Sequence, residues 1–138
     1  MTDEKGQIAG GGSDDPVAPY MRKFMREMNA GTVSLVLLAV LEQAERPMYG
    51  YEIAKLLESL STELAKIKQG TLYPVLRSME RSGLLASRVE PSVSGPPRRY
   101  YQVTAIGRAG LTEWRTAWSE IRNFVDAVLE GDYSDAVD

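Results

Sequence analysis

The chain has 138 residues, of which 43% are hydrophobic and 25% charged, the composition of one ordinary globular domain. It contains no cysteine and no histidine, so the usual thiol nucleophile, catalytic base and zinc ligands are missing, and we expect neither an enzyme nor a cofactor or metal site. No secretory signal or apolar run of membrane length is visible, which predicts a soluble, cytoplasmic protein without a membrane partner.

The net charge of −3 conceals an uneven distribution. Residues 66–108 carry eight basic and two acidic side chains, a net charge of +6, whereas residues 109–138 carry a net charge of −5. A basic middle between acidic ends indicates one surface that faces nucleic acid. From charge alone, a chance cluster on a mixed, solvated surface is an equally good interpretation.

The N-terminal third predicts a tail and two helices. Residues 1–15 are rich in Gly, Ser and Asp and predict a disordered tail. Apolar residues recur at three- and four-residue steps over 16–29, which predicts an amphipathic helix opened by Asp15 and Pro16. Asn29 to Thr32 breaks the pattern, so the dense apolar run 33–41 is expected to form a separate buried helix, and a globular domain is expected over 30–104.

The middle of the chain predicts two more helices and a hairpin. Helical apolar spacing occupies 51–60 and then 72–79, which Gly83 should end, with Pro74 near the first turn. The linker between these helices carries Lys66 and Lys68. Two extended segments, 84–90 and 98–104, flank a Pro/Gly/Ser-rich loop over 91–97 and indicate a hairpin with a projecting loop.

A long helix is expected over 105–130, capped by Thr104 and followed by an acidic tail over 131–138. Its apolar residues step by three and four, which is typical of the seam between two helices. The interpretation that we favour is a dimer interface, although the stripe could instead pack on its own domain. The expected interface residues are Leu111, Trp114, Trp118, Ile121, Val125 and Val128, together with Phe24 of the first helix.

This order of elements predicts a mainly α (α+β) fold, a winged helix-turn-helix with a two-stranded wing and a long C-terminal dimerisation helix. The third helix would enter the major groove of double-stranded DNA. Thr71, Tyr73 and Arg77 lie on its expected outer face, and Arg98 and Arg99 lie at the base of the wing. Lys66 and Lys68 precede the helix and are expected to contact DNA as well.

Four motifs resemble the PadR family of bacterial transcriptional regulators. They are MYGYEI at 48–53, GTLYPVL at 70–76 with Glu80, GLL at 83–85, and GPPRRYY at 95–101 with Thr104 and Gly107. The resemblance covers roughly residues 32–129 and implies a homodimer that represses a promoter and is released by a small molecule. It also implies that Tyr49 and Tyr51 lie near the DNA backbone. The single C-terminal helix is similar to the shorter, multidrug-sensing subfamily.

The same resemblance implies a place for the effector. In the multidrug-sensing relatives a tryptophan of the dimer helix stacks on flat ligands, and Trp118 takes that position here, with Trp114 one turn before it. Arg115 and Arg122 flank Trp118 on the same helical face, which would favour an anionic aromatic effector. Alternatively, both arginines pair with acidic side chains of their own helix or of the partner chain.

The predicted fold is also compatible with a different class of function. A winged helix can serve as a protein–protein interaction module without specific DNA binding. Such a module would not need basic residues concentrated on the third helix and the wing, so the +6 segment favours DNA.

Overall fold

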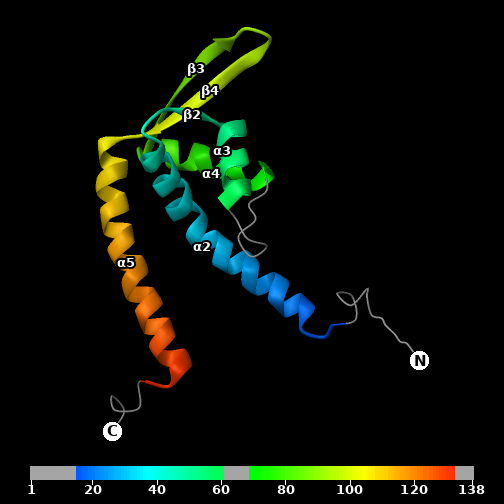
Figure 1. The fold of residues 1–138 in the computed structure, drawn as a ribbon, viewed down its shortest axis with the longest axis vertical. Coiled ribbons are helices and arrows are strands. Elements are labelled where there is room, and N and C mark those ends of the chain that lie inside the picture. The colour runs from blue at the N-terminus through cyan, green and yellow to red at the C-terminus, as the bar shows by residue number, and fades with distance from the viewer. Residues whose placement is uncertain (1–14, 61–68, 133–138) are drawn as a thin grey trace, which may run out of the picture.

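The computed structural model describes residues 15–60 and 69–132. In chain order the elements are α2 (Ala18–Ala44), β2 (Met48–Tyr49), α3 (Gly50–Leu60), α4 (Gln69–Arg81), β3 (Leu85–Ser92), β4 (Gly95–Val103) and α5 (Ala105–Glu130). Figure 1 shows a helical body from which the β3–β4 hairpin projects as a wing, while α5 and the first half of α2 extend away and diverge. The mainly helical winged-helix fold predicted from the sequence is confirmed, with β2 as an unforeseen third strand.

The predicted break between the first two helices is wrong. α2 runs without interruption through residues 29–32, so the expected division into a helix over 16–29 and a domain from residue 30 falls inside one helix. A glycine such as Gly31 destabilises a helix by only about 1 kcal/mol relative to alanine. The Thr32 hydroxyl donates a hydrogen bond to the Met28 carbonyl at 2.9 Å, within the same helix. The helix ends instead at Glu45, whose φ of 57° is left-handed, two residues before Pro47.

α2 is long and apolar enough to cross a bilayer by length and composition alone. Its second half, however, supplies Val33, Leu37, Leu38, Val40 and Leu41 to the core. Packing within the domain therefore accounts for the apolar residues in the second half of α2, whereas Tyr20, Met21 and Phe24 of the first half are exposed.

The three strands form one antiparallel sheet in the order β2-β4-β3. Met48 pairs with Tyr101 and Tyr49 with Tyr100, so β2 covers only the inner end of β4. Side chains alternate along β4, and Tyr101 therefore points into the core while Tyr100 lies on the opposite face with Tyr49.

The projecting part of the wing is a tighter hairpin than the sequence predicts. Only Val93 and Ser94 connect the two strands, so the expected loop over 91–97 is wrong. Pro96 and Pro97 are tolerated in β4 because they lie beyond β2, where one side of the strand has no partner. Val93 is fully exposed at the tip.

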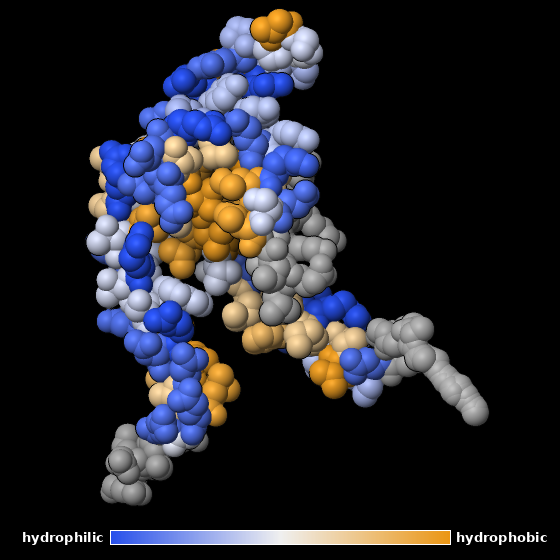
Figure 2. Space-filling model, viewed as in Figure 1, coloured by the Kyte–Doolittle hydropathy of each residue, from blue (hydrophilic) through white to orange (hydrophobic). Residues whose placement is uncertain are grey.

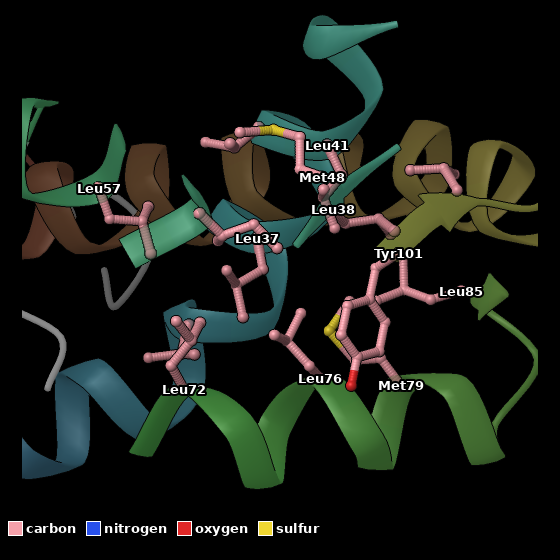
Figure 3. Packing of buried hydrophobic residues seen from close by; sticks show 14 of the residues in the cluster. Leu37, Leu38, Leu41, Met48, Leu57, Leu72, Leu76, Met79, Leu85 and Tyr101 are labelled. Atoms are coloured by element: carbon pink, nitrogen blue, oxygen red, sulfur yellow. The ribbon is translucent and has the colours of Figure 1, made fainter. Parts of the chain in front are cut away.

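The core lies where α2, α3, α4, the sheet and the start of α5 meet (Figure 3). Each fully buried leucine contributes about 2 kcal/mol by removing its surface from water. The completely buried large side chains are Leu37, Leu38, Ile53, Leu72, Leu76 and Leu85.

α4 ends as the sequence predicts, but it begins earlier. Gly83 has a φ of 84°, and the Leu84 N–H donates to the Met79 carbonyl at 2.9 Å, which closes the helix. Because the helix starts at Gln69, Pro74 lies in the second turn and not near the first. Its missing N–H therefore removes one bond from the helix interior.

The predicted cap of α5 is confirmed. The Thr104 hydroxyl accepts a hydrogen bond from the Gly107 N–H at 3.0 Å and donates to the Gly83 carbonyl at 2.6 Å. A β-carbon on Gly107 would lie 2.2 Å from the Leu84 carbonyl oxygen, so only glycine fits there. These contacts fasten the start of α5 to the turn that follows α4.

Candidate nucleic-acid interface

The outer face of α4 is polar and basic. Leu72, Leu76 and Met79 point into the core, which leaves Thr71 and Arg77 exposed on the opposite side, as predicted. In the described part of the chain no acidic side chain forms an ion pair with Arg77. The face therefore offers a guanidinium that is not neutralised and a hydroxyl, both of which can donate to DNA.

Tyr73 is held mainly by packing. Its ring lies over Gly50, where a β-carbon would come within 2.2 Å of Cε1 of the ring. Gly50 therefore allows α3 and α4 to approach closely. The half-buried ring favours a packing role for Tyr73, and contact of its hydroxyl with DNA stays a prediction.

The start of α3 orients two tyrosines. Glu52 accepts a hydrogen bond from the Tyr49 N–H at 3.1 Å, which is one of the two hydrogen bonds of a capping box. Glu52 also forms an ion pair with Arg46 at 3.3 Å. Tyr49 then stacks on Tyr51, with ring centroids 6.5 Å apart and an angle of 19° between the planes. Tyr51 is 53% exposed, so its phenol is available to a ligand.

Arg98 and Arg99 point to opposite faces of the wing. The Arg98 guanidinium lies 4.4 Å above the Tyr49 ring, on the face that also carries Tyr100. Arg99 donates to the Ser87 hydroxyl at 2.9 Å, and that hydroxyl donates to Glu80 of α4 at 2.6 Å. Arg98 therefore connects the wing to β2, and Arg99 connects it to α4 through Ser87 and Glu80.

The buried phenol of Tyr101 lies beside these charges. Burial raises the pKa of Tyr101 above its ordinary value of 10.0, and the negative charge of Glu80 raises it further, while Arg99 and Arg77 oppose the shift. Charges on the wing and on α4 therefore both act on the Tyr101 phenol.

The charges of the basic segment are not equally available. Arg88 forms an ion pair with Glu90 on the same strand, and Arg99 is held by Ser87. Among the described residues, by contrast, Arg77, Arg81 and Arg98 form no ion pair with a carboxylate. The surface that can attract phosphate is therefore narrower than the count of +6 indicates, and it comprises the outer face of α4 and the Tyr49 face of the wing. Lys66 and Lys68 lie outside the described residues.

The predicted seam of α5 divides into two parts. Leu111 is only 5% exposed and belongs to the core of its own chain, so its assignment to a dimer interface is wrong, and Trp114 packs partly on the same core. After Trp114 the apolar residues of α5 no longer pack on the core. Trp118, Ile121, Val125 and Val128 are exposed on α5, as is Phe24 on α2. Figure 2 shows hydrophobic residues on both diverging helices.

A hollow of about 260 Å³ lies between α2 and α5. Its lining by the described residues contains no charged side chain, and Arg115 and Arg122 are exposed outside it. The lining residues are Gly31, Ser34, Leu35, Trp114, Ala117, Trp118 and Ile121.

The model of the Transcriptional regulator PadR-like family matches residues 37–113, which include α3, α4, the wing and the start of α5. The chain belongs to this family. It is similar to transcriptional regulator Rv3488 of Mycobacterium tuberculosis, with 39% identity over 97 residues that cover 70% of this chain and 85% of the relative.

Two solved PadR structures share the fold. A PadR family transcriptional regulator from Eggerthella lenta has a TM-score of 0.65 and 34% identity, covering 86% of this chain and 96% of that one. A PadR-like transcription factor from Bacteroides fragilis has a TM-score of 0.63 and 27% identity, covering 77% and 98%. The PadR assignment makes the chain a DNA-binding regulator of transcription and not an enzyme.

Two exposed basic residues of this PadR chain lie beside predicted site residues but are not among them. Arg81 lies one turn after Arg77 on the outer face of α4, and Lys55 lies one turn after Tyr51 on α3. Helical spacing of four residues from a residue already singled out is the signal that could have found both.

Proposed function

We propose that this PadR-like regulator is a cytoplasmic homodimeric repressor that binds a near-palindromic operator and is released by a small, flat aromatic effector. The observation that carries the DNA part is the placement of Arg77 and Arg98, two arginines without an ion-pair partner in the described chain. They lie on α4 and the wing, the two elements that a winged helix applies to the major groove and the adjacent backbone.

The homodimer is supported by the apolar surface that the single chain leaves uncovered. Trp118, Ile121, Val125 and Val128 form one stripe on α5, and Val17, Tyr20, Met21, Phe24 and Met28 are exposed on α2. Soluble monomers rarely expose apolar patches of this extent. A two-fold axis between two copies would place two α4 helices on half-sites about one turn of DNA apart, or a multiple of that.

The effector is supported by the hollow beside Trp118. Its apolar lining and two indole rings suit a flat aromatic molecule. An anionic group on such a molecule would have to reach beyond the hollow to Arg115 or Arg122. Since the hollow lies between the helices that we assign to the dimer, an occupant would change the separation of the two DNA-binding surfaces.

A mobility-shift titration with the DNA upstream of the protein's own gene tests this function. We expect a shift that a matched random sequence does not compete away, and its loss on addition of a flat aromatic carboxylate that also quenches tryptophan fluorescence. The absence of any shift at low salt would contradict DNA binding and favour a protein–protein interaction module. A shift that survives a broad panel of such compounds, without quenching, would overturn the effector alone.

A further inference from the structure

We propose that four side chains, Lys55, Tyr51, Tyr49 and Arg98, form a cation–aromatic ladder that binds the phosphate backbone of DNA. In this proposal Lys55 and Arg98 are phosphate ligands at the two ends, and Tyr49 is the positioning residue that orients Arg98. The inference rests on the proposed DNA binding and adds to it a residue, Lys55, and a role for Tyr49.

The ladder is continuous across three elements. Nζ of Lys55 lies 5.9 Å from the centre of the Tyr51 ring on the same helix. Tyr51 stacks on Tyr49 of β2 with ring centroids 6.5 Å apart, and the Arg98 guanidinium of β4 lies over the Tyr49 ring at 4.4 Å from its centre. Tyr100 supports Tyr49 edge-on, with centroids 5.4 Å apart and the planes at 65°.

The Arg98 contact leaves its hydrogen-bonding groups free for a ligand. A guanidinium that stacks on a ring uses its face, whereas its five N–H donors lie in its plane. Within residues 15–60 and 69–132 no carboxylate forms an ion pair with Arg98. An exposed guanidinium that lies against a ring and has unused donors is suited to a phosphate, which it can meet with two parallel hydrogen bonds.

The Lys55 end has a competitor, but a weak one. Nζ of Lys55 lies 3.8 Å from a carboxylate oxygen of Glu58, and both side chains are well exposed. Exposed pairs of this kind contribute little and are readily exchanged. The DNA backbone, with about one negative charge per 1.7 Å of helix axis and condensed cations that it releases, would displace the pair.

The ladder also explains why the wing has two arginines in succession. Arg99 fixes the inner face of the hairpin to α4 through Ser87 and Glu80, while Arg98 fixes the outer face to Tyr49. The outer attachment is the one that leaves its donors exposed. Tyr49 therefore sets where the wing presents Arg98 relative to α3.

Binding of the upstream DNA, measured by fluorescence anisotropy between about 50 and 200 mM salt, tests the ladder. We expect Lys55→Gln to weaken binding about fivefold and to reduce the slope of log K against log salt by about one, as loss of a single phosphate contact should. Lys23→Gln is the matched control, since Lys23 pairs with Glu27 on the first half of α2 and should leave the slope unchanged. An unchanged slope for Lys55→Gln would overturn the assignment of Lys55.

The role of Tyr49 is tested by a double-mutant cycle in the same assay. We expect Tyr49→Phe to bind like the unsubstituted protein, and Tyr49→Leu to lose about as much affinity as Arg98→Gln. The double variant should lose no more than either single variant, and circular dichroism should show all of them folded. Additive losses, or a loss in Tyr49→Phe, would overturn the positioning role. If the unsubstituted protein does not bind, the proposed function itself fails, whereas binding with unchanged slopes and additive losses overturns only the ladder.

Discussion

Tyr101 connects the core, the wing and α4 through a single buried side chain. Its ring lies in the core next to Met79, as Figure 3 shows, and its phenol is within the electrostatic reach of Glu80, Arg99 and Arg77. The sequence predicts Tyr101 only as a strand residue. Its burial depends on the register with Met48 of β2, a two-residue strand too short to leave a recognisable pattern.

The raised pKa of Tyr101 predicts a loss of stability in alkali. A phenol whose pKa is higher in the folded than in the unfolded chain binds its proton more tightly when folded. Its contribution is therefore complete below the ordinary pKa of 10.0 and disappears as the pH rises through the folded value. We expect Tyr101→Phe to show a smaller fall in the free energy of unfolding between pH 9 and pH 11 than the unsubstituted protein, by denaturant titration. Equal falls would contradict the assignment.

At the scale of elements, the start of α5 determines where the long helix leaves the domain. Thr104 caps it, and Gly107 presses against the Leu84 carbonyl. The cap could be predicted, because a threonine before a helical pattern has a local signature. The close approach of Gly107 could not, because it depends on a turn that lies more than twenty residues earlier in the chain.

Gly107→Ala should therefore destabilise the protein by about 1–3 kcal/mol, since backbone cannot yield as a side chain can. Gly110→Ala is the control on the same helix, where a β-carbon meets only the end of the Leu84 side chain at 3.4 Å. Alanine should be neutral or favourable there, by up to about 1 kcal/mol. Thermal unfolding of both variants measures the difference, and similar melting temperatures would refute the packing described.

The spacing of apolar residues predicts a helix correctly where it is regular, and it predicts a false break where polar and small residues interrupt it. The spacing in α3, α4 and α5 predicts all three helices, with ends within a few residues. In α2 the Asn, Ala, Gly and Thr at 29–32 resembled a loop, yet they continue the helix. The local preference against helix is small and is outweighed by hydrogen bonds on both sides of the segment.

The sequence predicts which residue types make up the candidate site, but not the direction in which each side chain points. Adjacent arginines in a strand must face opposite ways, so Arg98 and Arg99 cannot have the same role, although the sequence groups them together. Leu111 shows the same limit on a helix, because a stripe of apolar residues does not reveal where the core of one chain ends and an interface begins. Only the packing of the folded chain separates these cases.

α2 and α5 expose apolar surfaces that we assign to contact with a second copy of the chain. Val125 is 44% exposed in the single chain, so a charge there costs the isolated fold little but would be buried in a dimer. We expect Val125→Glu to sediment as a monomer and the unsubstituted protein as a dimer. Asn123→Glu adds the same charge to the opposite side of α5 and should remain dimeric. A dimer in Val125→Glu would contradict the proposed seam.

We propose that this PadR-like chain meets DNA through the outer face of α4. Arg77 tests it most directly, because it is exposed and none of the described carboxylates pairs with it. We predict that Arg77→Gln will bind upstream DNA more weakly and that its affinity will fall less steeply with salt, by about one unit of slope for a lost phosphate contact. If Arg77 instead reads a base, affinity should fall by about 1–3 kcal/mol on the operator alone. Unchanged binding on every sequence and at every salt concentration would contradict the interface.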